Sequence, residues 1–324
     1  MRILFCGTTK GNAGPSNVNK GIVNNRTSSF VIIKSRNKYA RALEIVCKAI
    51  FCDVIVLSGV SRLGSIACSV AKIYGKKTVF IMHGCGEYEV KVNHQTNMEK
   101  GIQYEASILE RVDLILPVSK KYMLWVQNRY PQYAGKLGYL YNGFDVKYLE
   151  GIPKRHKKPG SVVATGADRG VKNNIVLVQA IEALEGKAEL SVCGAIYHGV
   201  PQGLRFSKYT GVIPHGQFVE KLSCTELFVL NSIFESFSLS AIEALMCGCS
   251  VLISEVAGVT DLLALEETDI IHDPMDVEEI RSKIEYLLAH PNNERILSSL
   301  DIEEYSYPRQ VQKLEAMCRE LVSK

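Results

Sequence analysis

Short apolar runs alternate with longer amphipathic stretches along the first 150 residues of the chain. The runs are rich in Val, Ile and Leu and have the length of buried strands, and the stretches between them have the spacing of helices. Alternation of this kind predicts a parallel sheet that helices cover on both faces. The expected strands are residues 2–6, 30–33, 54–57, 78–82 and 114–117. The expected helices are residues 37–50, 61–75 and 98–111, and a further one that Ser119 caps.

The second half of the chain repeats this alternation. Asp276 is placed to cap one of its helices together with Glu279, and Pro291 ends that helix. The expected strands are residues 161–165, 190–193, 227–230, 251–254 and 270–272, and the expected helices are residues 173–185, 215–223, 238–247, 276–290 and 308–323. We therefore expect an α/β protein with two Rossmann-like, doubly wound domains that face a cleft, because such sheets bind ligands at the carboxyl ends of their strands.

The border between the domains is expected where turn and linker residues gather. Residues 141–145 form a turn-rich break, and residues 151–160 read as a linker because two Pro and two Gly lie there among basic residues. The predicted domains are residues 1–150 and 151–305, followed by a terminal helix at 306–324.

Composition narrows the class of protein. Hydrophobic residues make up 47% and charged residues 22% of the chain, as in ordinary globular proteins. The apolar runs are far shorter than the roughly 20 residues of a membrane span, and the first residues lack the apolar core of a secretory signal. The ten cysteines form no CxxC pair, which disfavours a zinc knuckle and a disulfide framework. We expect a cytoplasmic protein with reduced thiols.

Charge is divided unevenly along the chain. Residues 1–150 contain 21 Lys and Arg against 10 Asp and Glu, whereas residues 151–324 contain 17 against 24. Because aromatic residues do not interleave with the basic ones, the basic half favours an anionic membrane surface or a polyanionic substrate, and no nucleic acid is expected as a partner. Residues 34–48 read as a basic amphipathic helix and are the expected contact surface. Uneven solvation of charge, with an ordinary surface helix, is the alternative.

The strongest chemical signal lies in residues 231–251. Glu235 follows a buried strand, and Glu243 lies eight positions later on the first turns of the next helix. The amides of residues 237–239 would then lie at a helix N-terminus, where unpaired N–H groups and the helix dipole favour a phosphate. Ionised carboxylates accept hydrogen bonds from hydroxyls, so the two Glu suit a sugar and a ribose.

This segment resembles the signature of the retaining glycosyltransferases of family 4, which have the GT-B fold. The family's pattern is PSxxExFGLxxxEAMAxGxPV, with two Glu separated by seven residues. The chain matches it at Ser232, Glu235, Phe237, Leu239, Glu243, Ala244, Gly248 and Val251. It differs at Asn231, Ser238 and Leu245, where the family has Pro, Gly and Met. The resemblance covers almost the whole chain.

The resemblance implies transfer of a hexose-type sugar from a nucleotide diphosphate sugar to a saccharide or lipid-linked saccharide acceptor, without a metal or other cofactor. It implies that the second domain holds the donor, that the first holds the acceptor, and that the last helix packs against the first domain. The catalytic residues that it implies are Glu235, Lys172, His83 and Arg169. The implied contacts to the nucleotide sugar are Glu243, Ser236, Phe237, Ser238, Leu239, Val212, Ile213 and Gly166.

The sequence positions of two cations and a histidine are consistent with transfer from a nucleotide diphosphate sugar. Lys172 and Arg169 lie in the loop after the strand at 161–165, where fixed cations would stabilise the charge that develops on a leaving diphosphate. Arg169 lies closer in sequence to Lys172 than the corresponding Arg does in the family, so Lys172 is the better match to the family's pattern. The alternative is that both are ordinary surface cations without a role in catalysis. His83 ends the strand at 78–82 and resembles the family's His near the donor sugar. Residues 85–95 are expected to be irregular and to recognise the acceptor.

Other functions remain open at this point. A catalytically silent nucleotide-sugar-binding protein, or a GT-B epimerase or phosphorylase, would carry the same site. A dehydrogenase is disfavoured, because the spacing of Gly7, Gly11 and Gly14 differs from the GxGxxG fingerprint. The basic first domain favours an acceptor at the membrane surface, with the protein peripheral on the inner face of the cell membrane and acting in cell-envelope polysaccharide synthesis.

Overall fold

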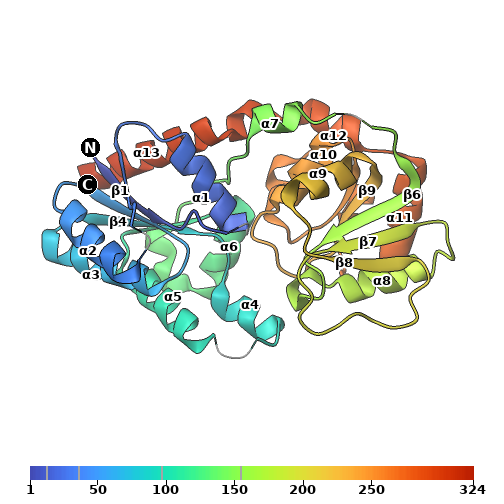
Figure 1. Cartoon of the computed structure of the whole chain (residues 1–324), viewed down its shortest axis with the longest axis horizontal. Coiled ribbons are helices and arrows are strands. Elements are labelled where there is room, and N and C mark those ends of the chain that lie inside the picture. The colour runs from blue at the N-terminus through green and yellow to red at the C-terminus, as the bar shows by residue number, and fades with distance from the viewer. Residues whose placement is uncertain (12–13, 36, 96–97, 154) are drawn as a thin grey trace. The chain divides into compact units, whose positions relative to one another are not determined.

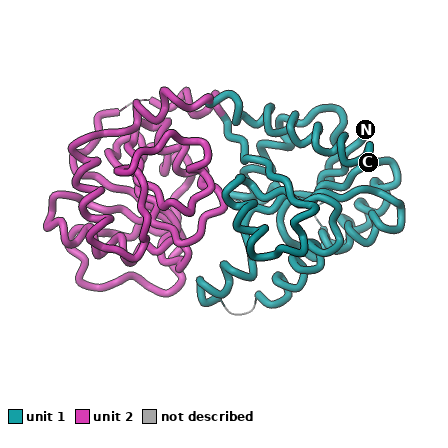
Figure 2. Tube along the Cα trace, turned by 180° about the vertical axis from the view of Figure 1, so that it is seen from behind, with its two compact units in different colours: residues 1–145, 302–324 teal, residues 146–301 magenta. Residues whose placement is uncertain are grey.

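The chain folds into two compact units, each built on a parallel sheet. The computed structural model describes residues 1–11, 14–35, 37–95, 98–153 and 155–324. Unit 1 contains Met1–Asp145 and Ile302–Lys324, and unit 2 contains Val146–Asp301 (Figure 2). Because both units are α/β domains with parallel strands, the predicted fold class is confirmed.

Unit 1 has a five-stranded sheet in the order β2-β1-β3-β4-β5. All neighbouring strands are parallel, and the central strand β3 is buried along its whole length, which explains its continuous apolar sequence. The strands are β1 (Ile3–Gly7), β2 (Phe30–Ile32), β3 (Val54–Ser58), β4 (Lys77–Met82) and β5 (Leu114–Pro117). Each lies within about two residues of its expected position.

Helices flank this sheet on both sides (Figure 1). Helices α2, α3 and α5 pack beside one another, and α1 packs against α13. Ser119 caps α6 as predicted, because its hydroxyl accepts a hydrogen bond from the Tyr122 amide at 3.0 Å. The helices are α1 (Gly14–Asn24), α2 (Lys38–Ala49), α3 (Arg62–Tyr74), α4 (Gly86–Val92), α5 (Glu99–Arg111), α6 (Lys120–Arg129) and α13 (Tyr307–Ser323), with short 3₁₀ turns η1 (Pro131–Lys136) and η5 (Ile302–Tyr305).

The sequence prediction of an irregular segment at 85–95 is wrong. Residues 86–92 form helix α4, and a distant side chain satisfies its first amides. The carboxylate of Glu105 on α5 accepts hydrogen bonds from the amides of Gly86 at 3.0 Å and Glu87 at 3.1 Å. Local sequence therefore could not reveal this helix, because its cap comes from another element.

The last helix belongs to unit 1. On α13, the carboxylate of Glu315 accepts hydrogen bonds from the hydroxyls of Thr27 and Ser29. The ring of Tyr307 lies so close to Gly21 of α1 that a Cβ there would be 2.1 Å from it. Glycine at this position thus allows α1 and α13 to pack closely.

Unit 2 has a six-stranded sheet in the order β11-β10-β9-β6-β7-β8. Aliphatic side chains such as Leu177, Leu227 and Ile284 form the core between this sheet and helices α8 and α11. The strands are β6 (Lys158–Thr165), β7 (Glu189–Cys193), β8 (Ser207–Gly211), β9 (Thr225–Leu230), β10 (Ser250–Ser254) and β11 (Ile270–Ile271). The helices are α7 (Val146–Glu150), α8 (Asn174–Glu182), α9 (His215–Ser223), α10 (Leu239–Met246), α11 (Val277–Ala289) and α12 (Asn293–Ser299), with 3₁₀ turns η2 (Gly170–Lys172), η3 (Gly258–Leu262) and η4 (Glu267–Asp269).

The cap of α11 is predicted only in part. The carboxylate of Asp276 accepts hydrogen bonds from the amides of Glu278 at 2.9 Å and Glu279 at 3.1 Å, as expected. The carboxylate of Glu279 does not reach back to Asp276. It accepts hydrogen bonds from the amides of His272 and Asp273, both at 2.9 Å, and so fixes the turn before the helix.

Within the described residues, no helix is both long and apolar enough to cross a membrane.

Candidate functional site

The loop after β9 is held in place through its backbone. The Ile233 amide donates to the Val171 carbonyl at 3.0 Å, on the turn that follows β6. On the other side, the carbonyl of Glu235 accepts from the Gly258 amide at 3.0 Å, and the carbonyl of Phe237 accepts from the Val259 amide at 2.9 Å. Neighbouring loops on both sides therefore fix the backbone that carries Glu235.

Lys172 and Glu235 form an ion pair at this edge of the sheet. The ammonium group of Lys172 donates to Oε2 of Glu235, and the two side chains are only 13% and 14% exposed. Gly166 makes room for this arrangement, because a Cβ there would lie 2.3 Å from Cγ of Lys172. Its φ of 92° is also one that glycine adopts readily. The structure thus brings together three residues that the sequence singled out.

Arg169 lies on the same turn as Lys172. Its amide donates to the Gly166 carbonyl at 3.1 Å, and its carbonyl accepts from the Lys172 amide at 2.9 Å. The backbone of Arg169 therefore shapes the turn that presents Lys172.

The N-terminus of α10 follows Glu235 directly in the chain. Ser236 and Phe237 lead to Ser238, which is the N-cap residue, and Leu239 begins the helix. The side chain of Ser238 makes no capping hydrogen bond to this helix; its hydroxyl lies 3.1 Å from that of Ser240. The first amides of α10 are therefore not closed by their own cap, and they keep the anion-binding character of a helix N-terminus.

Ser238 has a left-handed backbone with a φ of 92°. This region favours glycine, which is the residue that the resembled pattern has at this position. Glycine would adopt this backbone without strain, whereas Ser238 carries a hydroxyl beside the start of α10.

Glu243 on α10 is hydrogen bonded to a residue that sequence reasoning missed. Nε2 of His215 lies 2.8 Å from Oε1 of Glu243, and the ring of Tyr148 lies 5.8 Å from that of His215. His215 is the first residue of α9 and comes directly after the segment with Val212, which is exposed, and Ile213, which is half-buried. Its place in the sequence, directly after that segment, could have indicated that His215 lies near the nucleotide site. The hydrogen bond to Glu243 raises the pKa of His215 above its ordinary value.

His83 lies in unit 1, whereas the other predicted site residues lie in unit 2. It follows the last residue of β4, and its Nε2 lies 2.8 Å from the hydroxyl of Ser58 at the end of β3. Burial lowers the pKa of His83 to about 4, so the ring is neutral at pH 7. A neutral ring can donate through one nitrogen and accept through the other.

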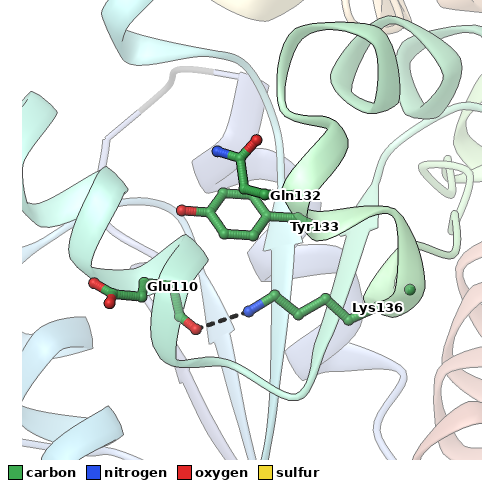
Figure 3. Close-up of a pocket in the computed structure, with 5 residues that line it drawn as sticks. Glu110, Gln132, Tyr133 and Lys136 are labelled. Atoms are coloured by element: carbon green, nitrogen blue, oxygen red, sulfur yellow. Dashed lines mark hydrogen bonds between the residues drawn. The ribbon is translucent and has the colours of Figure 1, made fainter.

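A pocket in unit 1 lies away from these residues. Glu110, Gln132, Tyr133, Gly135 and Lys136 line it (Figure 3). The ammonium of Lys136 donates to the carbonyls of Glu110 at 2.8 Å and Val112 at 3.0 Å, just before β5 begins. The pocket thus lies at the amino end of the strand, whereas His83 follows the carboxyl end of β4. Nothing in its lining suggests the chemistry described above.

In the described parts of the chain, no three His, Cys, Asp or Glu side chains gather where they could hold a metal ion.

We expect Ser238→Gly to raise the free energy of unfolding by about 1 kcal/mol, because it relieves a left-handed backbone that costs an L-residue about 1–2 kcal/mol. The matched control is Ser240→Gly, which removes the other hydroxyl of the pair from within α10 and should lower stability by about 0.5–1 kcal/mol. Chemical denaturation measures both. Equal destabilisation by the two variants would contradict the strain at Ser238.

We expect Glu243→Gln to lower the pKa of His215 towards its ordinary value, because the charged acceptor is lost. As the folded-state pKa of His215 is raised, the pair stabilises the fold below the ordinary pKa of His, and this contribution is lost as the pH rises through the raised value. NMR titration of the imidazole protons measures the shift. In the control Glu220→Gln, whose carboxylate pairs with Arg155 at 2.8 Å, His215 should titrate as in the wild type. An unchanged titration in Glu243→Gln would refute the assignment.

Comparisons with known proteins bear on the family and the fold. Residues 152–300 match the family model described as Glycosyl transferases group 1. A curated relative from Campylobacter jejuni, N-acetylgalactosamine-N,N'-diacetylbacillosaminyl-diphospho-undecaprenol 4-alpha-N-acetylgalactosaminyltransferase, is 26% identical over 222 residues. That alignment covers 61% of this chain and 57% of the relative, so the chain spans little more than half of that protein's length.

Solved structures share the fold over nearly the whole chain. Anabaena Alr3699/HepE in complex with UDP-glucose has a TM-score of 0.71 at 14% identity and covers 99% of this chain and 100% of its own. Sucrose-phosphate synthase from Thermosynechococcus elongatus has a TM-score of 0.70 at 17% identity and covers 100% of both chains. The glycosyltransferase WaaG has a TM-score of 0.63 at 15% identity and covers 96% and 99%. The family model thus matches most of unit 2, and the solved structures show that the chain has the GT-B fold.

Proposed function

We propose that the chain is a retaining glycosyltransferase that moves a hexose-type sugar from a nucleotide diphosphate sugar to a saccharide or lipid-linked saccharide. The observation that carries this proposal is the ion pair of Lys172 and Glu235 in the loop that leads directly into the uncapped start of α10. A cation, an acidic hydrogen-bond acceptor and a row of helix amides are what a sugar diphosphate requires.

Unit 2 binds the donor in this proposal. Glu243 accepts hydrogen bonds from the ribose, and the amides of residues 236–239 bind the diphosphate. The segment with Val212 and Ile213 contacts the base. The UDP-glucose complex of HepE, whose fold this chain shares, supports a nucleotide-sugar site.

Lys172 stabilises the diphosphate as it leaves. An ammonium has three N–H donors, so Lys172 can bind Glu235 and a phosphate oxygen at once. Negative charge grows on that oxygen as the glycosidic bond breaks, and fixed donors aimed at it lower the barrier. Arg169 adds positive charge on the same turn, and Glu235 accepts hydrogen bonds from hydroxyls of the transferred sugar.

The transferred sugar retains its anomeric configuration if the acceptor attacks from the face that the diphosphate leaves. The departing phosphate oxygen then takes the acceptor's proton, so neither a separate base nor a metal is required. His83 on unit 1 is neutral at pH 7, so its ring can donate one hydrogen bond and accept another.

The acceptor is proposed from charge and from the relative. The name of the Campylobacter relative specifies a diphospho-undecaprenol-linked acceptor, which supports a lipid-linked saccharide and a place in cell-envelope polysaccharide synthesis. A lipid-linked acceptor requires the enzyme to work at a membrane surface.

An exposed apolar stripe on unit 1 supports peripheral membrane binding. Tyr39, Leu43 and Cys47 recur every four residues on α2 and are exposed, whereas Ile45 and Ala49 face the core. Leu43 is 65% and Phe51, just beyond the helix, is 67% exposed. Apolar side chains on the solvent side of a helix indicate a surface that meets a partner or a bilayer.

Basic residues accompany this stripe. Ile73 on the neighbouring helix α3 is 76% exposed, and Lys38 and Lys72 are exposed on α2 and α3. Such an apolar and basic surface is complementary to anionic lipid, which attracts Lys and Arg near the headgroups.

The first experiment tests catalysis. A thermal-shift panel of nucleotide sugars identifies the donor, since a ligand at 100 times its Kd adds about 2.7 kcal/mol of stability. We then expect Lys172→Ala and Glu235→Gln to lower kcat by about 10²–10³-fold, because each loses a group that acts in the transition state. Glu243→Ala should instead weaken donor binding by about 10–100-fold, as for loss of a hydrogen bond to a charged group.

The control is Lys187→Ala, which breaks an exposed ion pair with Glu285 elsewhere in unit 2. This variant should have the kcat of the wild type. Full turnover by Lys172→Ala would contradict the proposal. Conversion of the donor sugar without any acceptor would indicate an epimerase. A requirement for inorganic phosphate would indicate a phosphorylase. Binding of the donor without turnover of any acceptor would indicate a catalytically silent binding protein.

The second experiment tests the membrane surface. We expect the wild type to float with vesicles that contain phosphatidylglycerol and not with phosphatidylcholine alone. The double variant Leu43→Glu/Phe51→Glu should reduce recovery by about tenfold or more, since each buried apolar side chain contributes about 1.5–3 kcal/mol. The control Ile175→Glu changes an equally apolar side chain, 49% exposed on α8 of unit 2, and should float normally. Equal recovery with both vesicle types would remove the proposal.

A further inference from the structure

The buried side chain of Asn231 joins three loops at one edge of the sheet of unit 2. Asn231 directly follows β9 and is 1% exposed. Its Nδ2 donates to the carbonyl of Asn173 at 3.2 Å and to the carbonyl of Pro274 at 3.0 Å. Asn173 lies on the loop after β6, and Pro274 lies on the loop after β11. One amide group therefore fixes the loops that follow three parallel strands relative to one another.

A second asparagine side chain tightens this link. Nδ2 of Asn173 also donates to the Pro274 carbonyl, at 2.6 Å, so that this oxygen accepts from both side chains with its two lone pairs. The backbone of Asn173 is left-handed, with a φ of 48°, a region that Asn enters more readily than most residues. The backbone that follows the turn η2 is thus set by these side chains.

The loop after β9 is bonded to the residues on either side of Lys172. The Ile233 amide donates to the carbonyl of Val171, which precedes Lys172, and Asn231 donates to the carbonyl of Asn173, which follows it. This same loop carries Glu235, the carboxylate partner of Lys172. Loss of the Asn231 donors would therefore release one side of Lys172 from the loop that presents its partner.

The side chain of Asn231 is an expensive way to stabilise the fold. Among the described residues, its buried Oδ1 has no hydrogen-bond partner, and a buried acceptor without a partner offsets part of the stability that the two donated bonds contribute. The resembled pattern has Pro at this position, which has no side-chain donor. The link between the three loops is thus a feature of this chain that points to placement of the loops.

We propose that Asn231 is a positioning residue that fixes Lys172 against Glu235, so that the ammonium keeps the position from which it stabilises the leaving diphosphate. This rests on the proposed role of Lys172 in catalysis. A fixed donor lowers the barrier only where it is aimed at the charge that develops, and a small displacement gives up much of the effect. The loss should therefore appear in kcat.

Kinetics with the donor that thermal shift identifies test this role. Asn231→Leu keeps nearly the same shape and removes the donors, and it should lower kcat by about 10–100-fold with little change in the KM for the donor. The double variant Asn231→Leu/Lys172→Ala should have the kcat of Lys172→Ala alone, because the placement of a side chain that is absent has no effect. Full kcat in Asn231→Leu, or losses that multiply in the double variant, would overturn the inference.

The matched control is Asn292→Leu. Asn292 is another buried asparagine of unit 2, 3% exposed, whose Nδ2 donates to the Val251 carbonyl and whose Oδ1 accepts from the Val251 amide, both at 2.9 Å. These bonds lie near the amino end of β10, away from the loops after the strands. The variant should lower stability at least as much as Asn231→Leu and keep the kcat of the wild type. If it lowers kcat to the same extent, loosening of unit 2 explains the result and the inference fails.

The placement of Lys172 can also be measured without substrate. Nitrogen-15 NMR of the lysine ammonium groups, with the Lys172 signal assigned by its loss in Lys172→Ala, should show that this signal shifts in Asn231→Leu, as it does in Glu235→Gln. The half-buried ammonium of Lys157, which donates to the Cys247 carbonyl at 2.6 Å, is the internal reference and should not shift. An unchanged Lys172 signal in Asn231→Leu would refute the positioning role. If the signal shifts but Lys172→Ala keeps full kcat, the proposed function fails while Asn231 still positions Lys172.

Discussion

The ion pair of Lys172 and Glu235 depends on the order of strands in the sheet of unit 2. Although 63 positions separate the two residues, the strands that precede them, β6 and β9, are neighbours. Parallel neighbours end at the same edge, so the loops after them meet. Gly166 then lets the lysine stem cross its own turn and reach the carboxylate. Strand order thus brings opposite charges together beside the helix start that follows.

The same rule operates in unit 1 with neutral groups. Gly7, Ser58 and His83 stand at or just beyond the carboxyl ends of β1, β3 and β4, which are consecutive in that sheet. Unit 2 therefore gathers charge and helix amides at this edge of its sheet, and unit 1 gathers the uncharged side chains of Ser58 and His83.

Sequence patterns predicted most of the fold because most of it is governed by local rules. Buried parallel strands are continuous apolar runs, and Ser119 and Asp276 cap helices that begin beside them. The elements that were missed lack those signals. Helix α1 is rich in Asn and Gly, α4 is capped by Glu105 from another helix, and β8 is a polar edge strand. These depend on tertiary contacts, which a single sequence does not display.

In the candidate site, too, residues with a local sequence signal were predicted and residues that depend on tertiary contacts were missed. Glu235, Lys172 and Gly166 could be named from a motif and its flanking strands, and they lie together. His215 and Ser58 could not, because each forms a hydrogen bond with a residue that is remote in sequence and is reached only through the fold.

The path of the chain has a consequence for how the protein is made. Unit 1 is discontinuous, since Ile302–Lys324 complete it only after the whole of unit 2 has been laid down. During synthesis, the middle of the chain can therefore reach its native state before the first part can. Until Glu315 and Tyr307 arrive, the hydroxyls of Thr27 and Ser29 and the face of α1 at Gly21 lack their native partners on α13. Unit 1 can therefore complete its native packing only after α13 has been synthesised, later than unit 2.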